Sequence, residues 1–175
     1  EQGDTTYHTL PNFEVASHCG DTLALNDELN NKNFVLHFFT AGCPGNCPEI
    51  FRKLKSLGEE YRNLDNLRIL SVTLEPNGDS IEELQAFEEE MEITNDQWHL
   101  TKGADSMTNR LLKEGFLFKG ERDTTRLQRR GIKLKPRNAL FLVDKKGRIR
   151  GAYKGSDQQE FKKLKDEIRV LFVGQ

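Results

Sequence analysis

The chain has 175 residues, enough for one domain with a hydrophobic core of its own. A net charge of −2, with 31% charged and 35% hydrophobic residues, argues against a general nucleic-acid-binding protein. No window approaches the ~20 apolar residues of a membrane span. No signal peptide is visible, but a mature or trimmed chain would lack one as well, so the sequence leaves the compartment open.

The most informative stretch is a strand, a cysteine loop and a helix in succession. Residues 34–39 are apolar except for His37, which predicts a buried central strand. Apolar side chains then recur at helical spacing at Ile50, Leu54, Leu57 and Tyr61. Cys43 and Cys47 lie between the two elements, where the strand ends and the helix begins.

This position suits thiol chemistry. Pro48 fits the first helical position, which would make Cys47 the N-cap. Unpaired N–H groups and the positive end of the helix dipole favour a thiolate there. The turn-forming residues 44–46 can bring the two cysteines within bonding distance. A small disulfide ring gains little from loop closure, so the pair is better suited to a redox switch or to metal binding than to a static disulfide.

The third cysteine lies at the tip of a predicted N-terminal β-hairpin. Alternating apolar and polar residues predict strands at 10–15 and 21–25. His18 and Cys19 fall in the connection between them. Two ligands at a hairpin tip bind a metal only weakly, so the pair receives no assigned function.

The middle of the chain predicts a parallel strand–helix unit. Residues 67–74 form a second strong strand, and the capping-box pattern from Ser80 to Glu83 begins a helix. Strand, helix, strand and helix in this order imply parallel pairing with helices over the sheet. Residues 97–101 then read as an edge strand or a loop, and residues 104–113 as a helix.

The last third predicts an antiparallel hairpin and a terminal helix. The hairpin joins 138–143 to 148–153, and Ser156 caps the helix that follows. Residues 114–137 show little periodicity and are interpreted as a basic loop or insertion. The acidic stretch 75–96 and the basic stretch 110–137 either form two solvated faces, or the basic loop docks an acidic partner or membrane surface.

These elements predict one domain over residues 1–175. Its class is α/β, with a thioredoxin-like fold: a central mixed sheet flanked by helices, preceded by an N-terminal β-hairpin. A dithiol at a helix start, directly after the first central strand, is the thioredoxin arrangement.

Five motifs carry a resemblance to a known family. They are Leu10 to Phe13, the cysteine motif from Cys43 to Pro48, Ser71 to Pro76, Trp98 to Gly103, and Leu142 to Gly151. Together they cover most of the chain, which resembles the SCO/SenC family of thioredoxin-fold proteins for copper delivery and thiol redox chemistry.

The resemblance implies a copper site that this chain has only in part. In that family two cysteines and one histidine hold copper, which here implies Cys43, Cys47 and the position of Pro136. No histidine follows His99, so the third ligand is absent. Two thiolates can still hold Cu(I), whereas Cu(II) is expected to bind poorly. Pro136 also lies near the position at which thioredoxins carry a cis-proline.

His37 has three candidate roles. It lies six residues before Cys43, where thioredoxins place a buried acid that handles the proton of the second cysteine. A histidine there could accept that proton from Cys47. It could instead replace the missing copper ligand, or be a hydrogen-bonded core residue.

Two functions follow. The first is a thiol–disulfide oxidoreductase that uses Cys43 and Cys47, needs no cofactor, and acts on a protein dithiol or disulfide. The alternative is a Cu(I) metallochaperone that delivers copper to a respiratory oxidase subunit. The resemblance further implies an extracytoplasmic, periplasmic location and a membrane tether through an N-terminal segment that is absent here.

Overall fold

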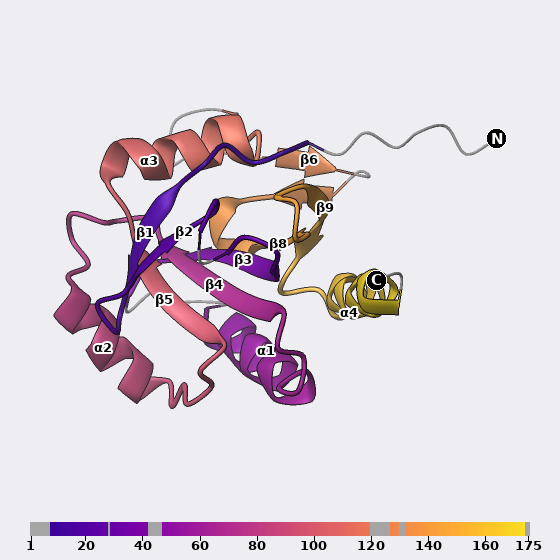
Figure 1. The fold of residues 1–175 in the computed structure, drawn as a ribbon, viewed down its shortest axis with the longest axis horizontal. Coiled ribbons are helices and arrows are strands. Elements are labelled where there is room, and N and C mark those ends of the chain that lie inside the picture. The colour runs from indigo at the N-terminus through magenta and orange to yellow at the C-terminus, as the bar shows by residue number, and fades with distance from the viewer. Residues whose placement is uncertain (1–7, 28, 42–46, 120–126, 130–131, 174–175) are drawn as a thin grey trace.

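The computed structural model describes residues 8–27, 29–41, 47–119, 127–129 and 132–173. A seven-stranded mixed sheet in the order β2-β1-β5-β4-β3-β8-β9 forms the centre (Figure 1). Its strands are β1 (Glu14–Ser17), β2 (Thr22–Ala24), β3 (Asn33–Phe39), β4 (Leu67–Thr73), β5 (Trp98–Lys102), β8 (Ala139–Val143) and β9 (Ile149–Lys154). The main helices are α1 (Cys47–Glu60), α2 (Ile81–Glu90), α3 (Asp105–Arg110) and α4 (Gln158–Val173).

The strand pairing confirms the thioredoxin-like α/β class. β3, β4 and β5 are parallel neighbours, as the strand–helix order predicts. β8 runs antiparallel to β3, and β9 antiparallel to β8, so the C-terminal hairpin extends the sheet on the other side of β3. β3 therefore lies between the two halves, and every residue in it is buried.

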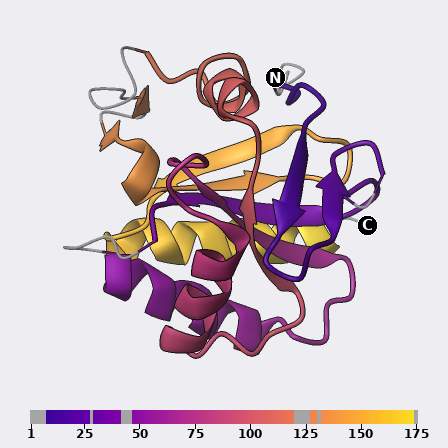
Figure 2. The ribbon, with the colours of Figure 1, turned by 90° about the vertical axis from the view of Figure 1, so that its left-hand side faces the viewer.

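The sheet separates two hydrophobic layers. Side chains from α1, α2 and α4 pack on one face, and side chains from α3 and the N-terminal segment pack on the other. Figure 2 shows this division, with α1, α2 and α4 on one side of the sheet and α3 on the other. Alternation along β3 sends Val35 and Phe39 to the α1 face and Phe34, Leu36 and Phe38 to the opposite face. His37 therefore points toward α1.

Two local predictions need correction. β5 is an interior strand, not an edge strand or a loop, because the N-terminal hairpin folds over and pairs β1 antiparallel with it. The cap of α4 is Asp157, not Ser156: its carboxylate accepts the N–H groups of Gln159 and Glu160 at 2.8 and 3.1 Å. Ser80, in contrast, caps α2 as predicted, accepting the N–H of Glu83 at 3.1 Å.

The region predicted as a basic loop contains short elements. The π-helical turn η1 (Leu111–Gly115) continues α3, and β6 (Leu127–Arg129) pairs antiparallel with β7 (Ile132–Leu134). The 3-10 turn η2 (Pro136–Asn138) then leads into β8. Part of this region lies outside the described residues. Among those described, every helix is too short or too polar to cross a bilayer.

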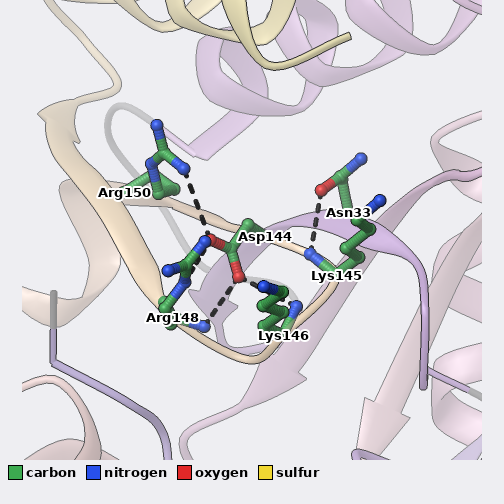
Figure 3. A network of polar contacts seen from close by, with 6 residues as sticks. All are labelled: Asn33, Asp144, Lys145, Lys146, Arg148 and Arg150. Carbon is green, nitrogen blue, oxygen red and sulfur yellow. Dashed lines mark hydrogen bonds and ion pairs between the residues drawn. The ribbon is translucent and has the colours of Figure 1, made fainter. Parts of the chain in front are cut away.

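A buried aspartate organises the turn between β8 and β9 (Figure 3). Asp144 is 2% exposed and accepts the N–H groups of Lys146 and Arg148 at 2.9 and 3.0 Å. Its other oxygen accepts from the Arg148 and Arg150 side chains at 2.8 and 3.5 Å. Asn33, at the start of β3, accepts a further main-chain N–H of the turn at 2.9 Å. The Leu142 to Gly151 motif thus has a structural role, away from the cysteine loop.

Candidate functional site

Three segments meet at the carboxyl end of β3. The cysteine loop leaves β3 there, and residues 74–80 leave the parallel strand β4 at the same edge. Because β8 is antiparallel to β3, the turn η2 that precedes it reaches this edge as well. The loops after β3 and β4 and the turn before β8 therefore frame the candidate site.

The two predicted redox cysteines are only partly described. Cys43 lies outside the described residues. Cys47 is the first residue of α1, so the helix begins one residue earlier than predicted, where Cys47 was expected to be the N-cap. The backbone places residue 47 at the helix N-terminus, where the helix dipole favours a thiolate over a thiol. The distance between the two sulfur atoms stays a prediction.

Ala41, just before the cysteine loop, is held by a buried carboxylate that the sequence alone did not indicate. Asp79, in the loop before α2, is 6% exposed. Its Oδ2 atom accepts the Thr73 hydroxyl at 2.5 Å and the main-chain N–H of Ala41 at 3.1 Å. Ala41 is the last described residue before the cysteine loop. The only sequence signal was an aspartate in a short loop after a strand, a pattern typical of solvated turns.

On the other side of the β3 end from β4 lies η2, where the resemblance places the missing copper ligand. Pro136 is buried, and η2 packs against β3 and α1. No cis peptide bond occurs among the described residues, so Pro136 does not reproduce the thioredoxin cis-proline. Arg137 next to it forms an ion pair with Glu75 at 3.8 Å, which joins η2 to the loop after β4.

His37 lies beneath this edge in the α1-facing core. Its ring is fully buried, and that burial lowers the pKa of the imidazole to about 3. Its ring centroid lies 5.2 Å from that of Phe51, in edge contact. Phe51 follows Cys47 by one helical turn of α1. The ring is therefore neutral at physiological pH and packs under the start of the helix.

The hydrogen bonds of His37 favour one tautomer. Its Nδ1 lies 3.2 Å from the hydroxyl of Ser71, which also accepts the indole N–H of Trp98 at 3.0 Å. If Ser71 donates to Nδ1, every polar atom of the hydroxyl is satisfied, and the His37 proton resides on Nε2. If Nδ1 instead carries the proton and donates to Ser71, the Ser71 hydroxyl proton has no acceptor among the described residues. Within the described part of the chain, Nε2 has no hydrogen-bond partner in either case.

This arrangement bears on both active roles of His37. A base with a pKa of about 3 is a poor proton acceptor from a thiol, whose pKa is ordinarily about 8.5. A ligand role through Nε2 requires moving the proton to Nδ1 and reversing the bond to Ser71. The geometry is that of a hydrogen-bonded core histidine.

His18, next to Cys19 in the N-terminal hairpin, is also held by structural contacts. Nε2 of His18 lies 2.8 Å from a carboxylate oxygen of Glu88 on α2, and Nδ1 accepts the N–H of Leu100 at 3.3 Å. Both ring nitrogens are thus occupied. Cys19 is an exposed free thiol whose pKa is raised, first by desolvation and then by nearby carboxylates including Glu88. Within the described ranges, no three His, Cys, Asp or Glu side chains are grouped to hold a metal.

Comparison with known proteins supplies the assignment that the geometry alone lacks. The SCO1/SenC family model matches residues 1–170. The chain belongs to the SCO1/SenC family. The match spans nearly the whole chain, including the cysteine loop, the position of Pro136 and the β8–β9 hairpin. No curated protein sequence matches the chain.

Solved SCO structures share this fold. A SCO1/SenC family lipoprotein from Bacillus anthracis is 18% identical, with a TM-score of 0.77 and coverage of 96% of this chain and 97% of that one. BsSco is a member of the Sco family of cytochrome c oxidase assembly proteins in which a disulfide switch has been identified. It is 17% identical, with a TM-score of 0.75 and coverage of 96% of this chain and 95% of that one. The copper-bound ScoI of Arabidopsis thaliana is 12% identical, with a TM-score of 0.68 and coverage of 95% and 99%. At these identities the likeness shows the fold alone.

Proposed function

We propose that this SCO1/SenC protein is an extracytoplasmic thiol–disulfide oxidoreductase that uses Cys43 and Cys47. The observation that carries the proposal is the structure around the dithiol loop. Residue 47 begins α1, where a thiolate is favoured, while the position that the family resemblance gives to the third copper ligand holds Pro136, which is buried and has no donor atom in its side chain. The chain therefore retains what disulfide exchange needs and lacks one copper ligand of its family.

The reaction transfers two electrons to a partner protein. The Cys43 thiolate attacks one sulfur of the partner disulfide, forms a mixed disulfide and releases the other sulfur as a thiolate. The Cys47 thiolate then attacks Cys43 Sγ and releases the second partner thiolate. The partner ends as a dithiol and this protein as the Cys43–Cys47 disulfide, and the reverse sequence oxidises a partner. The low pKa of His37 counts against its acting as the proton acceptor for Cys47.

The test is redox equilibration with glutathione in a Cys19→Ser background, which removes the exposed free thiol from thiol counts. We expect an intramolecular disulfide at a defined ratio of oxidised to reduced glutathione. In the same background, Cys47→Ser should trap a mixed disulfide with a small disulfide probe such as the Ellman reagent, because the resolving thiol is missing. Stable glutathione adducts on both cysteines, with no intramolecular bond, would contradict the redox function.

The second candidate is a Cu(I) metallochaperone, favoured by the copper-bound structures in the family, including the yeast and plant SCO proteins. The two thiolates are soft ligands that suit Cu(I), and the third ligand would have to come from elsewhere. Anaerobic titration with Cu(I) against a competing chelator tests this role. Tight one-to-one binding that is lost in Cys43→Ser would support it, and loss of copper on desalting would count against it.

The proposed partner is a protein dithiol or disulfide, or an oxidase subunit if copper is the cargo. The location outside the cytoplasm and the membrane tether rest on the family, in which one solved member is a lipoprotein. Fractionation of cells that express the natural gene, with a protease-accessibility test on intact spheroplasts, checks both. Recovery in the cytoplasmic fraction would contradict this part of the proposal.

A further inference from the structure

The buried carboxylate beside the cysteine loop has no role in the chemistry described so far. We propose that Asp79 is a positioning residue that anchors the Cys43–Cys47 loop through the main chain of Ala41, and so sets the equilibrium between dithiol and disulfide. This inference rests on the redox function proposed above.

The carboxylate is itself fixed in place. A buried carboxylate is costly unless it is hydrogen-bonded, and Asp79 Oδ2 has two donors from different parts of the fold. Thr73 ends β4 and donates its hydroxyl at 2.5 Å. The same hydroxyl oxygen accepts the N–H of Glu75 at 3.1 Å. Asp79 is thus bonded to the rigid end of the sheet and not merely to its own loop.

The second bond carries this rigidity to the cysteine loop. Ala41 lies two residues before Cys43, and its N–H points to Asp79 at 3.1 Å. The residues just before it are also fixed, because Leu74 N–H donates to the carbonyl of Phe39 at 2.8 Å. Asp79 therefore fixes the last described residue before the loop, while α1 fixes residue 47 at its other end.

Fixing both ends of a short loop favours ring closure. A loop that already has restricted freedom in the dithiol state loses less conformational entropy when the disulfide forms. Without the bond to Asp79, Ala41 gains freedom that disulfide formation must remove. Loss of the anchor is expected to shift the equilibrium toward the dithiol.

The negative charge of Asp79 could shift the same equilibrium by another route. A carboxylate near a thiolate disfavours it, and removal of the charge would stabilise the reduced form. Substitutions distinguish the effect of the anchor from the effect of the charge. Asp79→Asn removes the charge, but its amide oxygen can accept both hydrogen bonds. Asp79→Ala removes charge and anchor together, and Thr73→Val keeps the charge but releases one bond that holds it.

The experiment measures the equilibrium constant of each variant with glutathione, in the Cys19→Ser background, alongside its free energy of unfolding in urea. Glu83→Gln is the matched control, because Glu83 is an exposed acid in the first turn of α2. Thr73→Val keeps the inference testable if Asp79→Ala fails to fold. The glutathione equilibrium reports on the folded protein, so a purely structural role would not move it.

We expect Asp79→Ala to lower the equilibrium constant for disulfide formation by about tenfold, because it removes one hydrogen bond to a charged group. A tenfold change in this constant corresponds to a shift of about 30 mV in the reduction potential. Thr73→Val should shift it the same way by less, and Asp79→Asn and Glu83→Gln should stay close to the parent. Equal shifts in Asp79→Ala and Asp79→Asn would overturn the anchor in favour of charge. Lower stability with an unchanged equilibrium in Asp79→Ala and Thr73→Val would also overturn it. A parent protein that forms no Cys43–Cys47 disulfide would overturn the proposed function itself.

Discussion

His37 and Ser71 are register partners on adjacent parallel strands, and their side chains are joined at 3.2 Å between Nδ1 and Oγ. The same hydroxyl accepts the indole N–H of Trp98 on the next strand. One serine thus satisfies polar atoms from β3 and β5, on either side of its own strand. This contact explains how a histidine resides in the centre of an apolar strand without a charged partner.

The buried ring makes stability depend on pH. The pKa of His37 is lowered to about 3 in the folded protein from about 6.5 unfolded, so between these values the unfolded chain binds the extra proton. The stability from keeping His37 neutral is present above pH ~6.5 and is lost as pH falls toward about 3. From about pH 7.5 to about pH 5, we expect the free energy of unfolding to fall by about 2 kcal/mol through this group.

His37→Leu isolates that contribution in urea titrations at both pH values. The difference in unfolding free energy between variant and parent should change by the same ~2 kcal/mol in favour of the variant at the lower pH. His99 has a pKa lowered by burial as well, but it is common to both proteins and cancels in the difference. Parallel pH profiles for the two proteins would show that His37 does not carry the effect.

Ser71→Ala should be destabilising by about 2 kcal/mol, because it leaves two buried nitrogen atoms, on His37 and Trp98, without their common partner. The double variant with His37→Leu supplies the control, since it removes one of those nitrogen atoms. Urea titration should show that the double variant loses less than the sum of the two single losses. Additive losses would mean that the serine and histidine are not energetically coupled.

Local sequence patterns were sufficient to predict the central strand β3 and helix α1, but not the position of the neighbouring strand β5 in the sheet. The apolar run around His37 and the helical spacing after Cys47 report burial directly, and they predicted β3 and α1 nearly residue by residue. The interior position of β5 depends on the N-terminal hairpin folding over it, a long-range pairing that no local period encodes. The family motifs then added the expectation of thiol redox or copper chemistry.

The candidate site shows the same limit. Two cysteines at the start of a helix can be recognised from the sequence, because thiol chemistry depends on a few residue types that lie close together in the chain. Asp79 was invisible because its acidic neighbourhood is typical of a solvated loop, and only the tertiary contacts with Thr73 and Ala41 show it to be buried and bonded. The Ser71 bond to His37 likewise depends on strand register, which the sequence does not specify.

The β8–β9 turn should depend strongly on Asp144. Asp144→Ala removes a 2% exposed carboxylate and leaves the side chains of Arg148 and Arg150 without that partner. We expect a loss of about 3 kcal/mol in the free energy of unfolding. Asp166→Ala is the control: this acid pairs on the surface of α4, at 3.0 Å from Lys162, and its loss should cost at most about 1 kcal/mol. Similar losses for both variants would show that the turn network contributes no more than a surface pair.

Pro136→His tests whether this family member lost copper binding by one substitution. Pro136 lies in η2, at the edge where the cysteine loop leaves β3, and it has no side-chain donor atom. An imidazole there would complete a set of two thiolates and one nitrogen, the combination that suits Cu(II) better than thiolates alone. We expect the variant to develop a visible absorption band on addition of Cu(II), at one copper per protein, and the parent to show none. Arg137→His is the matched control, because Arg137 is the next residue in the chain, and its side chain is exposed and pairs with Glu75. A band of equal strength in the control, or none in Pro136→His, would show that position 136 does not face the dithiol.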